Sequence, residues 1–232
     1  MDILFSILGK SDSIYTYNWD LVAEKSIKRL CIEQYKNYKY LLNNFKIINT
    51  NYSKGIFLKL HGSINWGVCK NRHCNEYGNI QIFKNAENPN SMIDMLAKCN
   101  ICGKPLDILI IPPTSNKIEI QQNAIFHKEW LIAMNQLKKF QRIVFYGYSF
   151  PNTDFYSEWL FRQINYIIDG DRRVKYTIDV INPKMENVES YEYKRYHDIF
   201  RNHKVNSYSN VEEYIQREYK KCESNPLTYA ST

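Results

Sequence analysis

The sequence predicts an α/β fold, in which a parallel sheet carries helices on both faces and a small cysteine-bearing insert interrupts the chain. Three observations predict it. Short apolar segments alternate with amphipathic ones, polar residues or glycines follow most of the apolar segments, and four cysteines form two close pairs. With 232 residues, the chain is long enough for one sizeable domain, or for one domain with a small insert.

Five short segments rich in β-branched or aromatic residues are predicted strands: 13–16, 56–60, 107–111, 143–146 and 177–181. Amphipathic segments between them place their large apolar residues on one helical face, and the predicted helices are 21–46, 123–140, 154–168 and 186–200. Strands that alternate with helices form a parallel sheet with helices on both faces, so we expect a Rossmann-like arrangement.

Polar residues or glycines follow four of the five predicted strands. They are Asn18 and Asp20, the pair His61-Gly62, Gly147 and Ser149, and Asn182. The carboxyl ends of parallel strands lie along one edge of the sheet, where ligands bind in open α/β folds. We therefore expect these residues to converge on a binding site. Each pattern also has an ordinary structural explanation, such as a core histidine, a loop, or an Asn-Pro turn.

The cysteine pairs have the spacing of a zinc site. The pairs are Cys69 with Cys74 (C-x4-C) and Cys99 with Cys102 (C-x2-C). Two such pairs offer four thiolates to one tetrahedral Zn²⁺, and a set of four protein ligands makes the metal structural rather than catalytic. Disulfides and buried free thiols are the alternatives, and His73 could replace Cys74 as a ligand.

The predicted domain organisation follows from these positions. A zinc-ribbon insert is expected over residues 67–105, and the Rossmann-like domain over 1–66 and 106–232. Cys31 and Cys222 have no partner at metal-binding spacing, and we expect both thiols to be free.

The overall composition excludes several classes of protein. A hydrophobic content of 44% and a charged content of 24% are typical of a globular protein in water. Asp2 lies where a signal peptide has positive charge, and no segment approaches the length of a membrane span, so a cytoplasmic protein is expected. The net charge of +7 is scattered, which makes a nucleic-acid partner unfavourable but helps to attract a phosphate-bearing ligand.

Five features, in chain order, resemble the SIR2 (sirtuin) superfamily, and most closely the SIR2-like proteins of prokaryotic antiphage defence. The features are TYNWD (16–20), LKLHGSINW (58–66), the four cysteines, GYSFPNTDFY (147–156) and VINP (180–183). The resemblance covers roughly residues 12–200. It implies NAD⁺ as substrate, cleaved at the bond between nicotinamide and ribose, and a structural Zn²⁺.

The resemblance also implies roles for individual residues. His61 matches the catalytic histidine that acts as base on the ribose hydroxyls. Asn18 and Asp20 match catalytic residues at the nicotinamide end. The residues implied to bind the dinucleotide are Thr16, Asn18, Asp20, Gly147, Ser149 and Asn182. These roles are chemically reasonable, because a polar pocket stabilises the oxocarbenium-like centre formed when nicotinamide leaves, and a histidine can move a ribose proton near neutral pH.

Two departures from the family pattern shape the functional prediction. No Gly-rich turn precedes Thr16, so we expect that the first βα unit is absent and that a partner chain or a longer form of the protein supplies it. The family's V-x-F-G-E segment, which helps to bind an acyl-lysine peptide, is replaced here by ILIIPPTSN (108–116). This favours NAD⁺ hydrolysis over protein deacylation.

Three classes of function therefore remain as alternatives. The first is an NAD⁺ hydrolase, which the family resemblance implies to be a defence effector, with deacylation as its variant. The second is a non-catalytic or truncated module that binds NAD⁺ or ADP-ribose. The third is a zinc ribbon that acts on nucleic acid, which the few basic residues between positions 69 and 102 disfavour. A homo-oligomer or a partner chain is the expected assembly.

Overall fold

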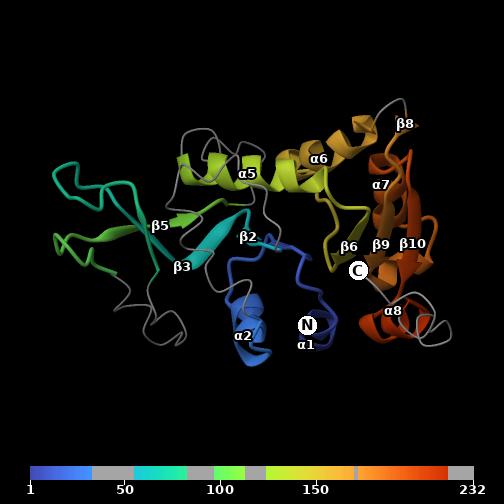
Figure 1. Ribbon diagram of the computed structural model, residues 1–232, viewed down its shortest axis with the longest axis horizontal. Coiled ribbons are helices and arrows are strands. Elements are labelled where there is room, and N and C mark those ends of the chain that lie inside the picture. Colours follow the sequence, from blue (N-terminus) through green and yellow to red (C-terminus); the bar gives the residue numbers. More distant parts are fainter. Residues whose placement is uncertain (33–54, 83–96, 113–123, 170–171, 219–232) are drawn as a thin grey trace, which may run out of the picture. The chain divides into compact units, whose positions relative to one another are not determined.

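The computed structural model describes residues 1–32, 55–82, 97–112, 124–169 and 172–218. The chain divides into two compact units, Met1–Met134 and Asn135–Thr232. Each unit contains a small parallel sheet together with helices (Figure 1). The predicted mixed α/β fold is confirmed.

The parallel sheet of the first unit pairs β1 (Ile14–Thr16) with β2 (Phe57–Lys59). Every residue of β2 is buried, as expected for a strand covered on both faces. Both strands were predicted from their apolar, β-branched or aromatic residues. In the parallel register Thr16 pairs with Lys59, so the two strands end at the same edge of the sheet.

Helices cover both faces of this sheet. Helices α1 (Asp2–Ser6) and α2 (Val22–Arg29) contribute Phe5, Ala23 and Ile27 to a buried cluster that includes Phe57 of β2. Helix α5 (Ala124–Leu137) lies on the other side of β2 from α2 (Figure 1). There the Trp130 indole N–H donates to the Leu60 carbonyl at 3.0 Å. Of the predicted helix 21–46, the portion 22–29 is helical, and residues 33–46 lie outside the described residues.

The first unit also contains an antiparallel sheet in the order β4-β3-β5. Its strands are β3 (Gly62–Cys69), β4 (Ile80–Ile82) and β5 (Leu106–Ile110). The segment 107–111 was expected in the parallel sheet, and it does form a strand, but β5 pairs antiparallel with β3. The reason is that β3 begins at Gly62, directly after His61, and offers β5 a long antiparallel partner.

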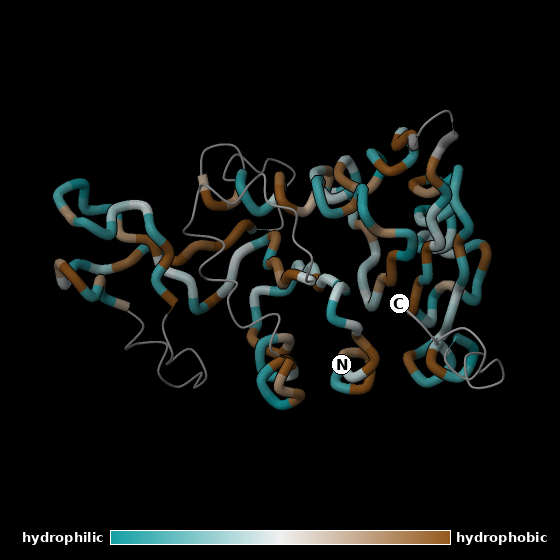
Figure 2. The backbone as a smooth tube through the Cα atoms, in the orientation of Figure 1, coloured by the Kyte–Doolittle hydropathy of each residue, from teal (hydrophilic) through white to brown (hydrophobic). Residues whose placement is uncertain are grey.

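The sequence does contain a signal for β3. Ile64, Trp66 and Val68 alternate with other residues at the period of a strand. Figure 2 shows the hydrophobic path of β5 beside the hydrophilic loop that follows β3. The predicted bounds of the insert, 67–105, stay a prediction; the antiparallel sheet itself begins at Gly62 and ends at Ile110.

The sheet of the second unit is parallel, in the order β10-β9-β6. Its strands are β6 (Arg142–Tyr146), β9 (Thr177–Ile181) and β10 (Lys204–Tyr208). The two earlier strands were predicted, whereas β10 was missed because KVNSY has little apolar character. Strands β7 (Ile168–Asp169) and β8 (Arg172–Arg173) pair antiparallel with each other and form a separate two-stranded sheet.

Helices cover both faces of this second sheet as well. Phe145 of β6 packs against Phe161 of α6 (Phe155–Arg162) and Tyr196 of α7 (Tyr191–Ile199), with ring centroids 4.9 and 5.3 Å apart. Tyr208 of β10 packs against Tyr214 of α8 (Val211–Glu218) at 5.0 Å. The 3-10 helices η5 (Gln163–Tyr166) and η6 (Pro183–Glu186) follow α6 and β9. Among the described residues, no helix has both the length and the apolar character needed to cross a membrane.

Candidate metal centre and strand-end sites

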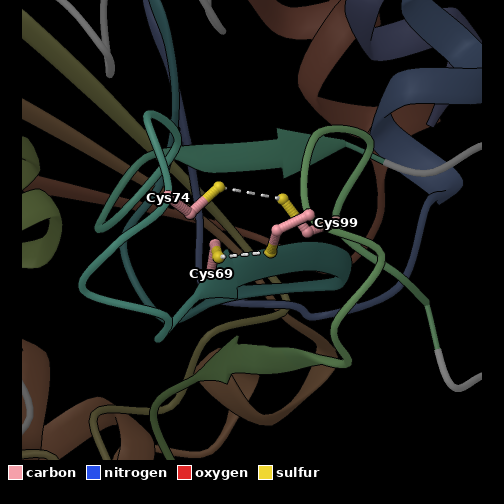
Figure 3. Close-up of side chains that lie close together, drawn as sticks. Cys69, Cys74 and Cys99 are labelled. Atoms are coloured by element: carbon pink, nitrogen blue, oxygen red, sulfur yellow. Dashed lines mark hydrogen bonds between the residues drawn. The ribbon is translucent and has the colours of Figure 1, made fainter.

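The four predicted metal ligands come together in the antiparallel sheet. The sulfur atoms of Cys69, Cys74, Cys99 and Cys102 all lie within 4.8 Å of one another (Figure 3). Cys69 ends β3, Cys74 lies in the loop after it, and the other pair precedes β5. Three of the thiols are buried and that of Cys102 is half-buried.

The spacing of the sulfurs fits a tetrahedral zinc site. The Sγ atoms of Cys69 and Cys102 are 3.7 Å apart, as are those of Cys74 and Cys99. Zn–S bonds of about 2.3 Å in a tetrahedron place the sulfurs about 3.8 Å apart. All four thiols are free of disulfides. The cluster therefore suits a structural Zn²⁺ held by four protein ligands.

Local backbone turns point N–H groups toward the cysteines. In the second pair the Gly103 N–H donates to the Cys99 carbonyl at 2.9 Å, and Gly103 has a φ of +67°. Hydrogen bonds from the backbone N–H groups of Cys102 and Ile101 lower the pKa of the Cys99 thiol to about 6, whereas burial raises the pKa of the Cys69 thiol. A low pKa favours the thiolate, which is the form that binds zinc.

Gln81 of β4 is a neighbour of the cluster that sequence reasoning missed. Its side-chain Nε2 lies 3.2 Å from the Cys99 Sγ, and its Oε1 accepts from the Asn100 N–H at 3.1 Å. The side chain is buried. Gln81 thus holds the second cysteine pair against β4, and no spacing rule in the sequence points to a glutamine in this role.

The alternative ligand His73 is not part of the cluster. It is exposed, whereas Cys74 is buried and contributes its sulfur. Cys31 is an exposed free thiol, as expected, and Cys222 lies outside the described residues.

The carboxyl ends of β1 and β2 place two of the predicted motifs side by side in the first unit. Thr16 is the last residue of β1 and its hydroxyl accepts from the Asn18 N–H at 3.1 Å. The ring of Tyr17, between them, packs edge-on against the His61 ring with centroids 4.9 Å apart. The loop after β1 therefore lies against the turn after β2.

His61 is buried, with 8% of its surface exposed. Its ring is also stacked with Trp130 of α5, with ring centroids 6.4 Å apart. Asn18 and Asp20 are exposed. The Asp20 carboxylate accepts from the Val22 N–H at 2.9 Å, so it helps to start α2.

The second unit places its own two motifs at one sheet edge. Tyr146 pairs with Ile181 in the parallel register, and the Gly147 N–H donates to the Ile181 carbonyl at 3.2 Å. The chain leaving β6, with Ser149, therefore lies beside the chain leaving β9, with Asn182. The Asn182 side chain accepts from the Lys184 N–H at 3.0 Å and caps η6, which is the ordinary role of asparagine in an Asn-Pro turn.

The backbone leaving β6 is strained and tightly held. Gly147 has a φ of +68°, and Phe150 has a φ of +50°, which is unfavourable for a residue with a side chain. The buried ring of Phe150 packs against Tyr196 and three phenylalanines, and this packing offsets the strain. The hydroxyl of Tyr196 donates to the Tyr148 carbonyl at 2.7 Å. Strain that packing maintains often accompanies a binding loop.

Comparison with known proteins leaves the family open. The chain matches no protein-family model and no curated protein.

Proposed function

We propose that the protein is an NAD⁺ hydrolase of the SIR2-like type, which cleaves the bond between nicotinamide and ribose. The observation that carries the proposal is the pairing of the strand ends in the first unit. His61 lies at the turn after β2, and the ring of Tyr17 packs against it from the loop that carries Asn18. The resemblance assigns the reaction to these same residues.

The chemistry requires two kinds of group. When nicotinamide leaves with the bonding electron pair, positive charge develops on the ribose. The amide oxygen of Asn18 would stabilise this charge, or Asn18 would hold the water that adds to the ribose in place of nicotinamide. His61 would accept a proton from a ribose hydroxyl. The aromatic rings of Tyr17 and Trp130 around His61 restrict its orientation. The orientation of the His61 ring would therefore already be fixed before a substrate binds at the sheet edge.

Within the second unit, we propose that the chain leaving β6 binds a nucleotide. Gly147 and Ser149 would lie against the phosphates and a ribose, where a glycine allows close approach of the backbone. Asn182 would contact the adenosine ribose through atoms not used in capping η6. The four-cysteine zinc site is proposed to stabilise the antiparallel sheet that follows His61, with no part in the chemical step.

We further propose that a second copy or a partner chain supplies a strand beside β6. Within the described residues β6 is the edge of its sheet, and Val144 and Tyr146 on it are 38% and 47% exposed. A parallel strand is normally buried on both sides.

The test is nicotinamide release from NAD⁺ by the protein in its natural assembly. We expect His61→Ala and Asn18→Ala each to lower the rate on the order of a hundredfold or more. His127→Ala is the matched control, since it removes an exposed histidine of α5. All variants should keep their zinc. Equal rates with and without His61 would overturn its catalytic role, and NAD⁺ binding without any cleavage would favour the binding-module alternative.

A further inference from the structure

Lys59 of β2 is a fully buried charged residue that neither the spacing rules nor the family resemblance assigned a role. None of its side chain is exposed. Its Nζ lies 2.7 Å from Glu24 Oε1 of α2 and 2.5 Å from the carbonyl oxygen of Asp20. Burial lowers the pKa of this ammonium, and the Glu24 carboxylate opposes that effect. A buried charge is unfavourable unless it is paired and hydrogen-bonded, so this arrangement requires an explanation.

The hydrogen bond to the Asp20 carbonyl explains why a charged residue is buried here, because through it Lys59 holds the loop that carries Asn18. The carbonyl of the preceding residue, Trp19, accepts from the Ile64 N–H at 3.0 Å and from the Ser63 hydroxyl at 3.3 Å. Two successive carbonyls of the loop are therefore held, one by β3 and the next by the Lys59 ammonium. At its other end the loop is held by the bond between the Asn18 N–H and the Thr16 hydroxyl.

The charge on Lys59 is balanced by Glu24 rather than by the second carboxyl nearby. Glu129 of α5 accepts from the Lys59 backbone N–H at 3.1 Å and is fully buried. Burial raises the pKa of Glu129 well above its usual value, which favours its neutral form. Lys59 and Glu24 thus form the ion pair, and Glu129 holds the β2 backbone beside them.

We propose that Lys59 is a positioning residue: it anchors the loop of residues 18–20, which carries Asn18 and follows directly after the Tyr17 ring that packs against His61. The proposal rests on the proposed function for its kinetic consequence, but the anchoring itself concerns only the loop. A lysine suits the task because its long side chain carries a charged donor from a buried strand to a backbone carbonyl. That bond is stronger than one between neutral groups.

Three variants test the proposal. Lys59→Met keeps the length of the side chain and removes its charge and donors. Lys59→Met combined with Glu24→Gln also removes the carboxylate that would be left unpaired. Arg29→Ala is the matched control, because it breaks an ion pair of α2 with Asp2 at 2.7 Å in which both partners are exposed.

The first measurement is amide hydrogen exchange of the peptide that spans residues 17–22. We expect exchange to be faster by at least about tenfold in both Lys59 variants, the equivalent of one hydrogen bond to a charged group. The Arg29 control should show no change. Equal protection in the wild type and in the double variant would overturn the proposal. Global unfolding of both Lys59 variants would overturn it too, by assigning Lys59 to overall stability.

The second measurement is the kinetics of NAD⁺ cleavage by the same variants. We expect kcat to fall on the order of tenfold to a hundredfold with KM little changed, as for a group misplaced at the chemical step. If the variant with both Lys59→Met and Glu24→Gln is as stable as the wild type but has a lower kcat, the loss of rate comes from positioning and not from lost stability. If the double variant regains the wild-type kcat, the positioning role is wrong. If the wild type itself never cleaves NAD⁺, the proposed function fails, and hydrogen exchange alone decides whether Lys59 anchors the loop.

Discussion

A Cβ atom on Gly62 would lie 2.1 Å from the carbonyl oxygen of Leu109. Gly62 also has a φ of +77°, a conformation that residues with side chains rarely adopt. The chain can therefore turn after His61 and pair β3 with β5 only with glycine at this position. The glycine after the histidine has a structural reason that is independent of any ligand.

Replacing Gly62 with alanine should destabilise the protein by more than about 2 kcal/mol, from backbone strain together with the clash. The matched control is Gly78→Ala, because Gly78 has a similar φ of +75° but no atom within 4 Å of the added Cβ. That variant should lose only about 1 kcal/mol, the strain of the backbone. Denaturant unfolding measures both, and equal losses would show that the contact with Leu109 is unimportant.

The cluster of four cysteines predicts about one Zn²⁺ per chain, measurable by metal analysis of the purified protein. Changing Cys99 and Cys102 together to serine should abolish binding and loosen β3–β5, because a small metal-bound element depends on its ion for folding. Cys31→Ser is the control, since that thiol is exposed and outside the cluster. A metal-free protein whose β3–β5 sheet is fully protected from hydrogen exchange would contradict the structural role.

Glu129→Gln should raise stability at higher pH. The folded-state pKa of Glu129 is raised by burial, so above its usual value of 4.5 the unfolded chain releases the proton while the folded chain retains it. Folding stability is therefore lost as pH rises from that value toward the folded pKa, at up to about 1.4 kcal/mol per pH unit for one group. The glutamine variant does not lose stability in this way. The difference between its free energy of unfolding and that of the wild type should therefore be larger near about pH 8 than near about pH 5.

A control for the pH measurement has the opposite sign. The Lys184 ammonium, 2.7 Å from Glu192, lowers the pKa of that carboxyl. Glu192 therefore contributes stability above its unfolded pKa and loses it as pH falls, so Glu192→Gln should be destabilising at neutral pH. If both variants change with pH in the same direction, the assignment of Glu129 as a neutral buried acid is wrong.

The exposed edge of β6 predicts self-association of the isolated chain. Val144→Lys should weaken it at least about tenfold, because a charge on an edge strand blocks pairing with another chain. Val188→Lys is the matched control, since Val188 is 55% exposed and lies outside every strand. Sedimentation over a range of concentrations measures the association. A wild type that stays monomeric throughout would remove the support for a strand supplied by another chain.

Some parts of the site could be predicted from local signals. The cysteine cluster could be predicted because the spacings C-x4-C and C-x2-C are typical of metal ligands, and Cys69, Cys74, Cys99 and Cys102 do come together. Strands such as 177–181 could be predicted because a short run of apolar, β-branched residues is typical of a buried strand. By contrast, the roles of Asn18 and His61 stay predictions, since the contact between Tyr17 and His61 brings their two loops together but does not show that the reaction occurs.

By itself, the sequence determined the alternation of strands and helices, the two cysteine pairs spaced for a metal, and the strand ends that carry polar residues. These follow from residue type and spacing within short segments, where local preferences act. Only the tertiary structure decided that β5 pairs antiparallel with β3, that Gln81 reaches Cys99, and that Lys59 reaches the carbonyl of Asp20. These contacts join residues far apart in the chain, and a buried lysine or glutamine looks like any surface residue until folding brings its partner within reach.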